Sequence, residues 1–506
     1  MVFRIILAGH WRAVLLQTNA CPRKFRKRLL SMVRFMPKGY WLVSTLLLIG
    51  LLGIVPAIEG NGLYAAPGAN SQGRPNFVFV LADDMGWGDV ASYGHPDLKT
   101  PNIDRMAREG IQFTQFYVAS PICSPSRAAF MTGLFPARVR MHSYLATPPE
   151  GDLAFNGARG MVNYLDPEIP TVTRFLQEAG YAVGYFGKWH LGKAPGAPLP
   201  SAYGIDQYRT YDSNRESWQI RDKSFQYYSS KFIMDEGLRF IEENSGEPFF
   251  VQVNLMDPHT PLFVTEEQTE PYRKFGSALQ IYYSTITRID TEVGRLLAEL
   301  DKLGLAENTI VMFSSDNGPD TMLITQNHVP GSNGPFRGRK RSLYEGGVRV
   351  PLTVRWPASA PAGRVDSTTI LAAVDFLPTL SALAGIDIPK HLSIDGEEMS
   401  GAFRGKITRR KRPLYWDFRF NIRGDPNDHS PRLAVREDHW KLLMNPNRDR
   451  LELYDIPNDA GETDNLATEY PGVVDRLVRL LLDWHRTLPD GPVDPDAGSN
   501  RYPWPR

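Results

Sequence analysis

The hydrophobic positions of this chain fall into short continuous runs and longer periodic segments from residue 76 onward. The run Asn76–Ala82 is almost wholly apolar, as in a parallel strand that is buried on both faces. Further strands are predicted at 112–118, 181–186, 248–254 and 308–314. Helices are predicted at 100–108, 171–179, 222–243 and 277–303. Strands that alternate with helices predict an α/β fold with a mixed, mostly parallel central sheet flanked by helices.

The pattern changes near residue 388, where short strands and turn signals replace the long helices. A helix over 374–380 is closed by Gly385, and 389–412 is predicted to be a loop. Short strands are predicted at 413–418, 433–436, 440–444 and 452–455, followed by a helix at 473–485. This pattern predicts a smaller C-terminal α+β lobe with an antiparallel sheet. We therefore divide the folded chain into a main domain, 76–388, and a C-terminal subdomain, 389–506.

Residues 1–66 have the pattern of a basic leader with a secretory signal. A basic region without acidic residues, 23–38, precedes an apolar run at 40–58 and small residues up to Ala66. Because the apolar run approaches the roughly 20 residues that span a bilayer, an uncleaved anchor is the alternative. Translation that begins at Met32 or Met36 would shorten the basic part. Both a cleaved signal and an uncleaved anchor predict an exported protein, periplasmic or secreted. Residues 67–75 are predicted to be a linker.

Composition excludes several classes of protein. The chain has 506 residues, a formal net charge of +1 and 42% hydrophobic residues, which excludes a disordered chain or a coiled coil. The balanced charge gives no global field for nucleic acid or an acidic membrane. The chain has 2 cysteines, Cys21 in the leader and Cys123. An exported protein would therefore carry one unpaired cysteine in an oxidising compartment.

Cys123 lies where a predicted strand turns into a short helix. Pro125 suits the first turn of that helix, because its missing N–H costs nothing there. A helix N-terminus favours negative charge, so it can activate a nucleophile or hold an anion. Arg127, one turn later, directs its donors to the same region. A buried structural cysteine is the alternative interpretation.

Carboxylates directly follow two of the predicted strands. Asp83 and Asp84 come after the first strand, and Asp316 and Asn317 follow the strand at 308–314. Each pair by itself is typical of a turn. Together they place three carboxylates and an amide oxygen at one edge of the sheet, where like charges need a cation for balance. An all-oxygen set favours calcium, with magnesium as the alternative.

Three further polar segments contain candidate residues. Lys188 and His190 follow the strand at 181–186 and would share a face on an extended segment. His259 lies between two prolines that would fix its loop. Lys340 belongs to a cluster of basic residues, for which a solvated loop is the alternative interpretation.

These segments, in this order, resemble the type I sulfatases of the alkaline phosphatase superfamily. The resemblance rests on Cys-x-Pro-x-Arg followed by Met-Thr-Gly, on Gly-Lys-Trp-His-Leu-Gly and on Glu-Gly-Gly, and it covers roughly 75–467. It implies an alkaline phosphatase-like fold and conversion of Cys123 to formylglycine by a separate maturation enzyme. The implied catalytic residues are Cys123, Arg127, Lys188, His190, His259 and Lys340. The implied metal ligands are Asp83, Asp84, modified Cys123, Asp316 and Asn317. Leu134 departs from the arginine that many members carry after Thr-Gly.

The resemblance implies the hydrolysis of sulfate monoesters. The hydrated aldehyde would attack sulfur with Asp316 as base, His259 would protonate the leaving alcohol, and His190 would assist release of sulfate. The glycan-acting members, such as N-acetylgalactosamine-6-sulfatases, are most similar, so a sulfated polysaccharide is the expected substrate. No nucleic-acid partner is expected, and a membrane is expected only through an uncleaved leader. The alternatives are a phosphoester or phosphonate hydrolase of the same fold and a non-catalytic sulfated-glycan binder. Candidates for specificity in the C-terminal lobe are Asp417, Arg419, Arg423, Asp425, Asn427 and His429.

Overall fold

The computed structural model describes residues 73–145, 156–192, 196–211, 223–320, 331–422 and 425–499. The expected leader and most of the expected linker lie outside these residues. Within the described ranges, no helix combines the length and apolar character needed to cross a membrane.

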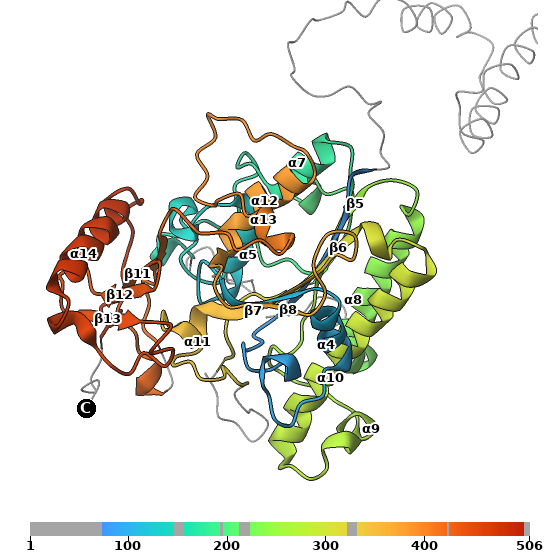
Figure 1. The fold of residues 1–506 in the computed structure, drawn as a ribbon, viewed down its shortest axis with the longest axis horizontal. Helices are drawn as coiled ribbons and strands as arrows, with labels where there is room; N and C mark the ends of the chain where they lie inside the picture. Colours follow the sequence, from blue (N-terminus) through green and yellow to red (C-terminus); the bar gives the residue numbers. More distant parts are fainter. Residues whose placement is uncertain are drawn as a thin grey trace, which may run out of the picture. The chain divides into compact units, whose positions relative to one another are not determined.

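A nine-stranded sheet forms the centre of the main domain (Figure 1). Its strand order is β4-β3-β5-β1-β6-β7-β2-β8, and β9 also pairs with β2. The strands are β1 (Asn76–Ala82), β2 (Ile111–Tyr117), β3 (Ala182–Lys188), β4 (Gln207–Tyr211), β5 (Phe249–Asn254), β6 (Thr309–Ser315), β7 (Arg349–Arg355), β8 (Arg364–Asp366) and β9 (Leu371–Ala372). Only β7 runs antiparallel to its neighbours, β2 and β6. The prediction of a mixed, mostly parallel sheet is therefore confirmed.

Helices cover both faces of this sheet. As a consequence, β1 is buried along its whole length. Phe77 and Phe79 belong to one hydrophobic core, and Val78 and Val80 belong to the other. The first core is covered by α5 (Cys123–Thr132), α7 (Val172–Glu178) and α12 (Phe376–Leu383). The second core is covered by α4 (Pro101–Arg108), α8 (Lys223–Glu243) and α10 (Ser277–Lys302) (Figure 1). A continuous apolar strand in the sequence thus became a strand between two helical layers.

The C-terminal part forms a four-stranded antiparallel sheet in the order β10-β11-β12-β13. Its elements are β10 (Leu414–Asp417), β11 (Leu433–Glu437), β12 (Trp440–Met444), β13 (Glu452–Asp455) and the helix α14 (Pro471–Arg486). Trp416 joins this sheet to the main domain, since its indole Nε1 donates a hydrogen bond to Val118 O at 2.8 Å. The apolar side chains of both parts belong to one continuous core. The predicted antiparallel sheet is confirmed.

Several predictions of local structure were incomplete. The sequence pattern did not predict β4, β7, β8 or β9. It also missed three short helices, α9 (Glu266–Thr269), α11 (Glu345–Val348) and α13 (Ser400–Phe403), the last inside a segment predicted to be a loop. The strand β7 begins at Arg349 and ends at Arg355, and both arginines are buried in ion pairs. Pairing with β2 and β6 therefore stabilises β7 as a strand, although its local sequence pattern did not predict one.

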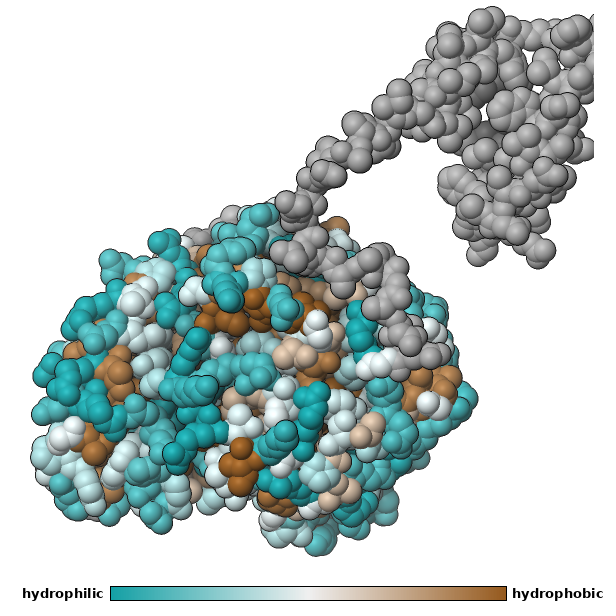
Figure 2. Space-filling view, turned by 45° about the horizontal axis from the view of Figure 1, so that its top comes forward, coloured by the Kyte–Doolittle hydropathy of each residue, from teal (hydrophilic) through white to brown (hydrophobic). Residues whose placement is uncertain are grey.

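The visible surface of the described domain is mainly hydrophilic. Hydrophobic residues on this face form separate groups among polar ones (Figure 2). Exposed hydrophobic residues in such small groups are normal for a folded protein and do not by themselves indicate an interface.

Candidate active site

The carboxyl ends of adjacent parallel strands bring the predicted carboxylates together. Ala82 at the end of β1 pairs with Ser315 at the end of β6. Asp83 and Asp84 follow directly after β1, and Asp316 and Asn317 follow after β6. On the other side of β1, Leu81 pairs with Asn254 of β5. The site therefore lies at the strand ends, where ligands bind in open α/β sheets.

Short contacts join the two groups of acidic and amide side chains. The backbone N–H of Asp84 donates to Asp316 Oδ1 at 3.2 Å, and Asn317 Nδ2 donates to Asp84 Oδ1 at 2.7 Å. Asp84 has a φ of +66°, a left-handed conformation that is uncommon outside glycine and is typical of functional sites. Asn317 Oδ1 is buried and has no hydrogen-bond partner among the described residues. An orphan oxygen of this kind needs a ligand to replace the water that it lost.

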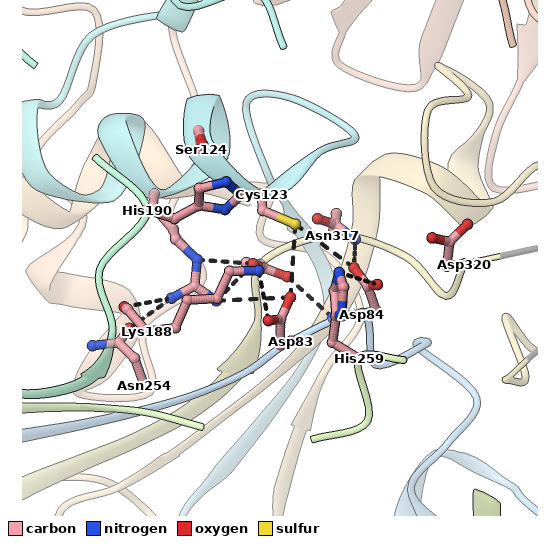
Figure 3. A network of polar contacts seen from close by, with 12 residues as sticks. Asp83, Asp84, Cys123, Ser124, Lys188, His190, Asn254, His259, Asn317 and Asp320 are labelled. Atoms are coloured by element: carbon pink, nitrogen blue, oxygen red, sulfur yellow. Dashed lines mark hydrogen bonds and ion pairs between the residues drawn. The ribbon is translucent and has the colours of Figure 1, made fainter. Parts of the chain in front are cut away.

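Cys123 is the first residue of α5 and faces the carboxylates (Figure 3). Its Sγ lies 3.7 Å from Asp83 Oδ1 and 3.9 Å from Asp84 Oδ1. Burial raises the pKa of the Cys123 thiol to about 12, although Lys188 and Lys340 oppose the shift. Burial of the thiol therefore outweighs the two nearby positive charges. An unmodified thiol here is protonated at neutral pH and is a weak nucleophile.

Three basic side chains neutralise the three carboxylates. Arg127 binds Asp316 Oδ2 through Nε at 2.9 Å and through its terminal Nη2 at 2.7 Å. Lys188 Nζ lies 2.6 Å from Asp83 Oδ2. Lys340 Nζ lies 2.6 Å from Asp84 Oδ2. Side chains far away in the sequence therefore balance these carboxylates, and charge balance alone does not require a metal ion.

Burial and neighbouring charges shift the pKa values of Asp84 and Asp316 in opposite directions. Burial would raise the pKa of Asp84, but the charges of Lys340 and His259 outweigh it and lower that pKa. Burial and the nearby Asp83 carboxylate raise the pKa of Asp316 despite its contact with Arg127. Asp316 is thus the more basic of these two carboxylates.

Lys188 ends β3, and the chain turns immediately after it. Gly187 has a φ of +101°, and a Cβ there would lie 1.8 Å from Asn254 O, so a glycine is required where β3 meets β5. His190 has a φ of +55°, so the extended segment predicted for Lys188 and His190 is wrong. The His190 ring nevertheless lies beside Cys123 (Figure 3).

His190 has the properties of a neutral base. Its Nε2 lies 3.0 Å from Leu145 O, and a carbonyl can only accept, so Nε2 carries the proton. Burial and the charge of Lys188 hold the pKa of His190 well below its usual value. The ring is therefore neutral, and Nδ1 keeps its lone pair.

His259 approaches the carboxylates from the loop after β5. Its Nδ1 donates to Thr260 O at 2.6 Å, which leaves Nε2 3.6 Å from Asp84 Oδ2. Burial lowers the pKa of His259 to about 4, against the charge of Asp84. The loop is held by Asp257, whose carboxylate accepts from Arg288 at 2.6 and 2.8 Å.

The donor atoms fit a hard divalent cation. Ligand atoms of Asp83, Asp84, Cys123 and His259 all lie within 4.8 Å of one another, and the orphan Asn317 Oδ1 adds a further oxygen. Asp316, which the resemblance implied as a ligand, is not a member of that group of four, and its Oδ2 is bound to Arg127. Oxygen donors of this type suit calcium or magnesium.

The structure adds residues to this site that the sequence analysis did not single out. Asn254 Oδ1 accepts from Arg127 at 3.2 Å, and Arg288 anchors the His259 loop. Asp320 lies 3.5 Å from Lys340 Nζ. A polar residue at the end of an apolar strand was the available signal for Asn254. A loop aspartate and a helical arginine carry no comparable local signal.

Two of the candidates for specificity in the C-terminal lobe have another role. The side chain of Asp417 is buried, and Arg419 and Arg432 bind it at 2.8 and 2.9 Å, so this cluster is structural. The Asp425 side chain accepts a hydrogen bond from the backbone of Asn427 in a short turn. Arg423 lies outside the described residues.

The site thus combines carboxylates, lysines and a helix N-terminus at the carboxyl edge of a mostly parallel sheet that helices cover on both faces. The family model "Sulfatase" matches residues 75–386, and the model "N-sulphoglucosamine sulphohydrolase, C-terminal" matches residues 333–485. N-acetylgalactosamine-6-sulfatase from Canis lupus familiaris is 30% identical over 499 residues, which cover 87% of this chain and 90% of that protein. Human arylsulfatase A is 30% identical over 461 residues, 80% and 86% of the two chains. The chain belongs to the sulfatase family and is a sulfuric ester hydrolase.

Solved structures show the same fold. The crystal structure of Ps i-CgsB in complex with k-i-k-neocarrahexaose has a TM-score of 0.69 and 27% identity, and it covers 81% of this chain and 92% of that one. A phosphonate monoester hydrolase of Agrobacterium radiobacter has a TM-score of 0.60 at 21% identity, and it covers 82% and 96% of the two chains. At that identity the second likeness shows the fold alone.

Proposed function

We propose that this sulfatase removes sulfate from a sulfated carbohydrate, with a formylglycine made from Cys123 and a divalent cation. The position of Cys123 carries the proposal: this residue is buried at a helix N-terminus and faces Asp83 and Asp84. A relative named N-acetylgalactosamine-6-sulfatase and a structural neighbour in complex with a neocarrahexaose support a carbohydrate substrate. The high pKa of the thiol supports conversion, because the unmodified side chain is a poor nucleophile.

Calcium, with magnesium as the alternative, would be held by oxygens at the edge of the sheet. The proposed ligands are Asp83, Asp84, Asp316, Asn317 and modified Cys123. The bound cation supplies positive charge that stabilises the sulfate oxygens as the ester bond breaks. Formylglycine hydrate supplies one hydroxyl for attack and a second that lets sulfate leave.

Lys188 and Lys340 are proposed to bind the sulfate group. Each makes one close contact with a different carboxylate, at 2.6 Å. A lysine is a mobile point charge, so these ammonium groups can exchange a carboxylate for a sulfate oxygen once the carboxylate binds a metal ion. Arg127 would stay on Asp316 and keep that carboxylate oriented.

The two histidines are proposed to move protons on opposite sides of the reaction. His259 would protonate the leaving alcohol through Nε2 only as an imidazolium, because Nδ1 already donates its proton to Thr260 O. The negative charge of a bound sulfate ester would favour that charged form, against the burial that lowers the pKa of His259 to about 4. His190 would accept a proton from the hydroxyl that remains at residue 123, because its ring is neutral and Nε2 already donates to Leu145 O. Asp316, the carboxylate with the raised pKa, would accept the proton of the attacking hydroxyl.

We also propose that the protein is exported before it acts. The basic and apolar pattern of residues 1–66 supports this location, as does a single cysteine left for oxidation after removal of the leader. A maturation enzyme would act on the Cys123 segment, and Leu134 is the residue there that departs from the family pattern.

Mass spectrometry and paired assays test this function. The tryptic peptide that contains Cys123, from protein made in its native host, is expected to carry formylglycine in place of cysteine. The enzyme is expected to hydrolyse 4-nitrophenyl sulfate faster than 4-nitrophenyl phosphate. A screen of sulfated mono- and disaccharides then identifies the sugar. An unmodified thiol would favour a glycan binder, and faster phosphate turnover would favour a phosphoester hydrolase.

A further inference from the structure

A second charged pair lies against the sulfate-binding residues and has no role in the chemistry proposed above. Asp320 Oδ1 lies 2.7 Å from the Arg341 guanidinium, and its Oδ2 lies 3.5 Å from Lys340 Nζ. Both side chains are 12% exposed, so they are partly open to solvent where Asp84 and Lys340 are almost completely buried. Figure 3 places Asp320 on the Asp84 side of the site, away from Lys188 and His190.

Asp320 also lines a hollow beside the metal-binding carboxylates. The hollow is formed by Asp84, Pro258, Thr260, Leu262, Tyr282 and Asp320, among others. Apolar surface from Pro258 and Leu262 lies there next to polar groups from Asp320 and Asp84. The hollow itself is only large enough for about one water molecule, so its mixed surface would contact the edge of a sugar ring rather than enclose the ring.

The backbone holds Arg341 in a strained conformation next to Lys340. Arg341 has a φ of +77°. Asp84 and His190 in the same site also have a positive φ. Its N–H donates to Pro121 O at 2.8 Å, and the N–H of Lys340 donates to Pro319 O at 3.1 Å. These bonds fasten the Arg341 turn to the segment before Cys123 and to the loop that carries Asp320. Strain of this kind persists where the surrounding structure requires a defined position for a side chain.

From these contacts we infer that Asp320 and Arg341 determine specificity by binding hydroxyl groups of the sugar that carries the sulfate. The inference rests on the proposed function. A carboxylate has about four acceptor positions, and Asp320 would accept from a sugar hydroxyl in addition to its contacts with Arg341 and Lys340. The guanidinium donates to hydroxyl oxygens, and the two groups together match neighbouring hydroxyls on one ring. Because Asp320 lies 3.5 Å from a lysine that binds sulfate, it reaches the carbons next to the sulfated position.

The competing explanation is that Asp320 only positions Lys340 by its charge. The two explanations differ in what happens to a substrate without hydroxyl groups. Positioning of Lys340 matters equally for every sulfate ester, whereas hydroxyl recognition matters only for a sugar. Aryl sulfates therefore separate them.

The test compares Asp320→Asn with wild type on two substrates. One is 4-nitrophenyl sulfate, and the other is the sulfated monosaccharide that wild type hydrolyses fastest in a panel. We expect kcat/KM to fall by about 10- to 100-fold on the sugar, the loss typical of a hydrogen bond to a charged group. On 4-nitrophenyl sulfate the expected change is under about 3-fold. Equal losses on both substrates, or no loss on either, would overturn the inference.

A matched control and a binding measurement complete the test. Asp235 also pairs with one lysine and one arginine, but on the outer helices α8 and α10, so Asp235→Asn should change neither rate. In a Cys123→Ala background, calorimetry measures binding of the sulfated monosaccharide and of inorganic sulfate without turnover. Asp320→Asn should weaken binding of the sugar and leave binding of sulfate unchanged. The proposed function fails if wild type hydrolyses no sulfate ester, and the inference fails if both ligands weaken together.

Discussion

Two buried clusters of charged residues in this protein differ in how their lysines are held. The candidate site pairs three carboxylates with Arg127, Lys188 and Lys340. The second, here the lobe network, consists of Glu345, Glu462, Lys441, Arg349 and Arg436 where the C-terminal sheet meets the main domain. Lys441 Nζ lies 2.9 Å from both Glu345 and Glu462. In the site, each lysine makes its closest contact with one carboxylate, at 2.6 Å.

The surroundings of the two clusters differ in the same way. Glu345 Oε2 also accepts from Tyr117 at 2.7 Å and from Arg349 at 3.1 Å, and these charges lower the pKa of Glu345 to about 2 against its burial. The orphan oxygen of Asn317 and the positive φ of Asp84 do not distinguish the candidate site, because Glu462 in the lobe network has a φ of +52° and a buried oxygen without a hydrogen bond. The difference lies in the lysines: Lys441 bridges two glutamates in a structural network, whereas Lys188 and Lys340 each make one close contact that a ligand can replace.

Replacement of Cys123 should have the largest effect on activity. Cys123→Ala removes the side chain that would become the nucleophile, so turnover of 4-nitrophenyl sulfate should fall by more than about 10⁴-fold. Thermal unfolding should stay close to that of wild type, because the residue contributes chemistry and little packing. Retained activity would show that residue 123 is not the nucleophile.

Lys441→Met should cause the largest loss of stability. The substitution leaves two buried glutamates without their shared cation. Such a loss lowers the free energy of unfolding by about 3–5 kcal/mol. Urea denaturation measures the loss. The control is Lys231→Met, since Lys231 forms an exposed pair with Asp235 and should change stability by less than about 1 kcal/mol. A mild effect at Lys441 would contradict the structural role of the lobe network.

Lys340→Met should reduce activity strongly and stability only moderately, the reverse of what we expect for Lys441→Met. We expect kcat/KM for a sulfate ester to fall by about 10²- to 10³-fold, the usual loss for one preorganised electrostatic group. In calcium-containing buffer the loss of stability should be smaller than for Lys441→Met, because bound metal can satisfy Asp84. Equal destabilisation by the two variants would remove the distinction between the clusters.

Calcium should stabilise the protein by a smaller amount. At a free concentration of 100 times Kd, a ligand of the native state adds about 2.7 kcal/mol to the free energy of unfolding. Urea denaturation of matured protein with calcium and with EDTA measures this difference. Asn317→Ala removes the orphan oxygen and should reduce the difference. An undiminished effect in the variant would place the ion elsewhere.

Local patterns predicted the main secondary structure well. The run 76–82 became β1 with the same boundaries, and the helix at Cys123 begins at that residue, because continuous apolar runs and first-turn prolines act within a few residues. The missed strand β7 shows the limit of this reasoning. Its terminal arginines are buried in ion pairs: Arg349 pairs with Glu345 four residues earlier, and Arg355 pairs with Glu109 from a distant segment.

The sequence by itself placed the acidic pair Asp83 and Asp84 and the pair Asp316 and Asn317 at the carboxyl edge of the sheet, since each pair directly follows a strand. Only the tertiary structure decided how their charges combine. Arg127, Lys188 and Lys340 neutralise the three carboxylates across separations of more than 100 residues, and burial sets the direction of the Cys123 pKa. Electrostatic energy depends on distance and solvent exposure in three dimensions, and neither quantity can be read from residue order.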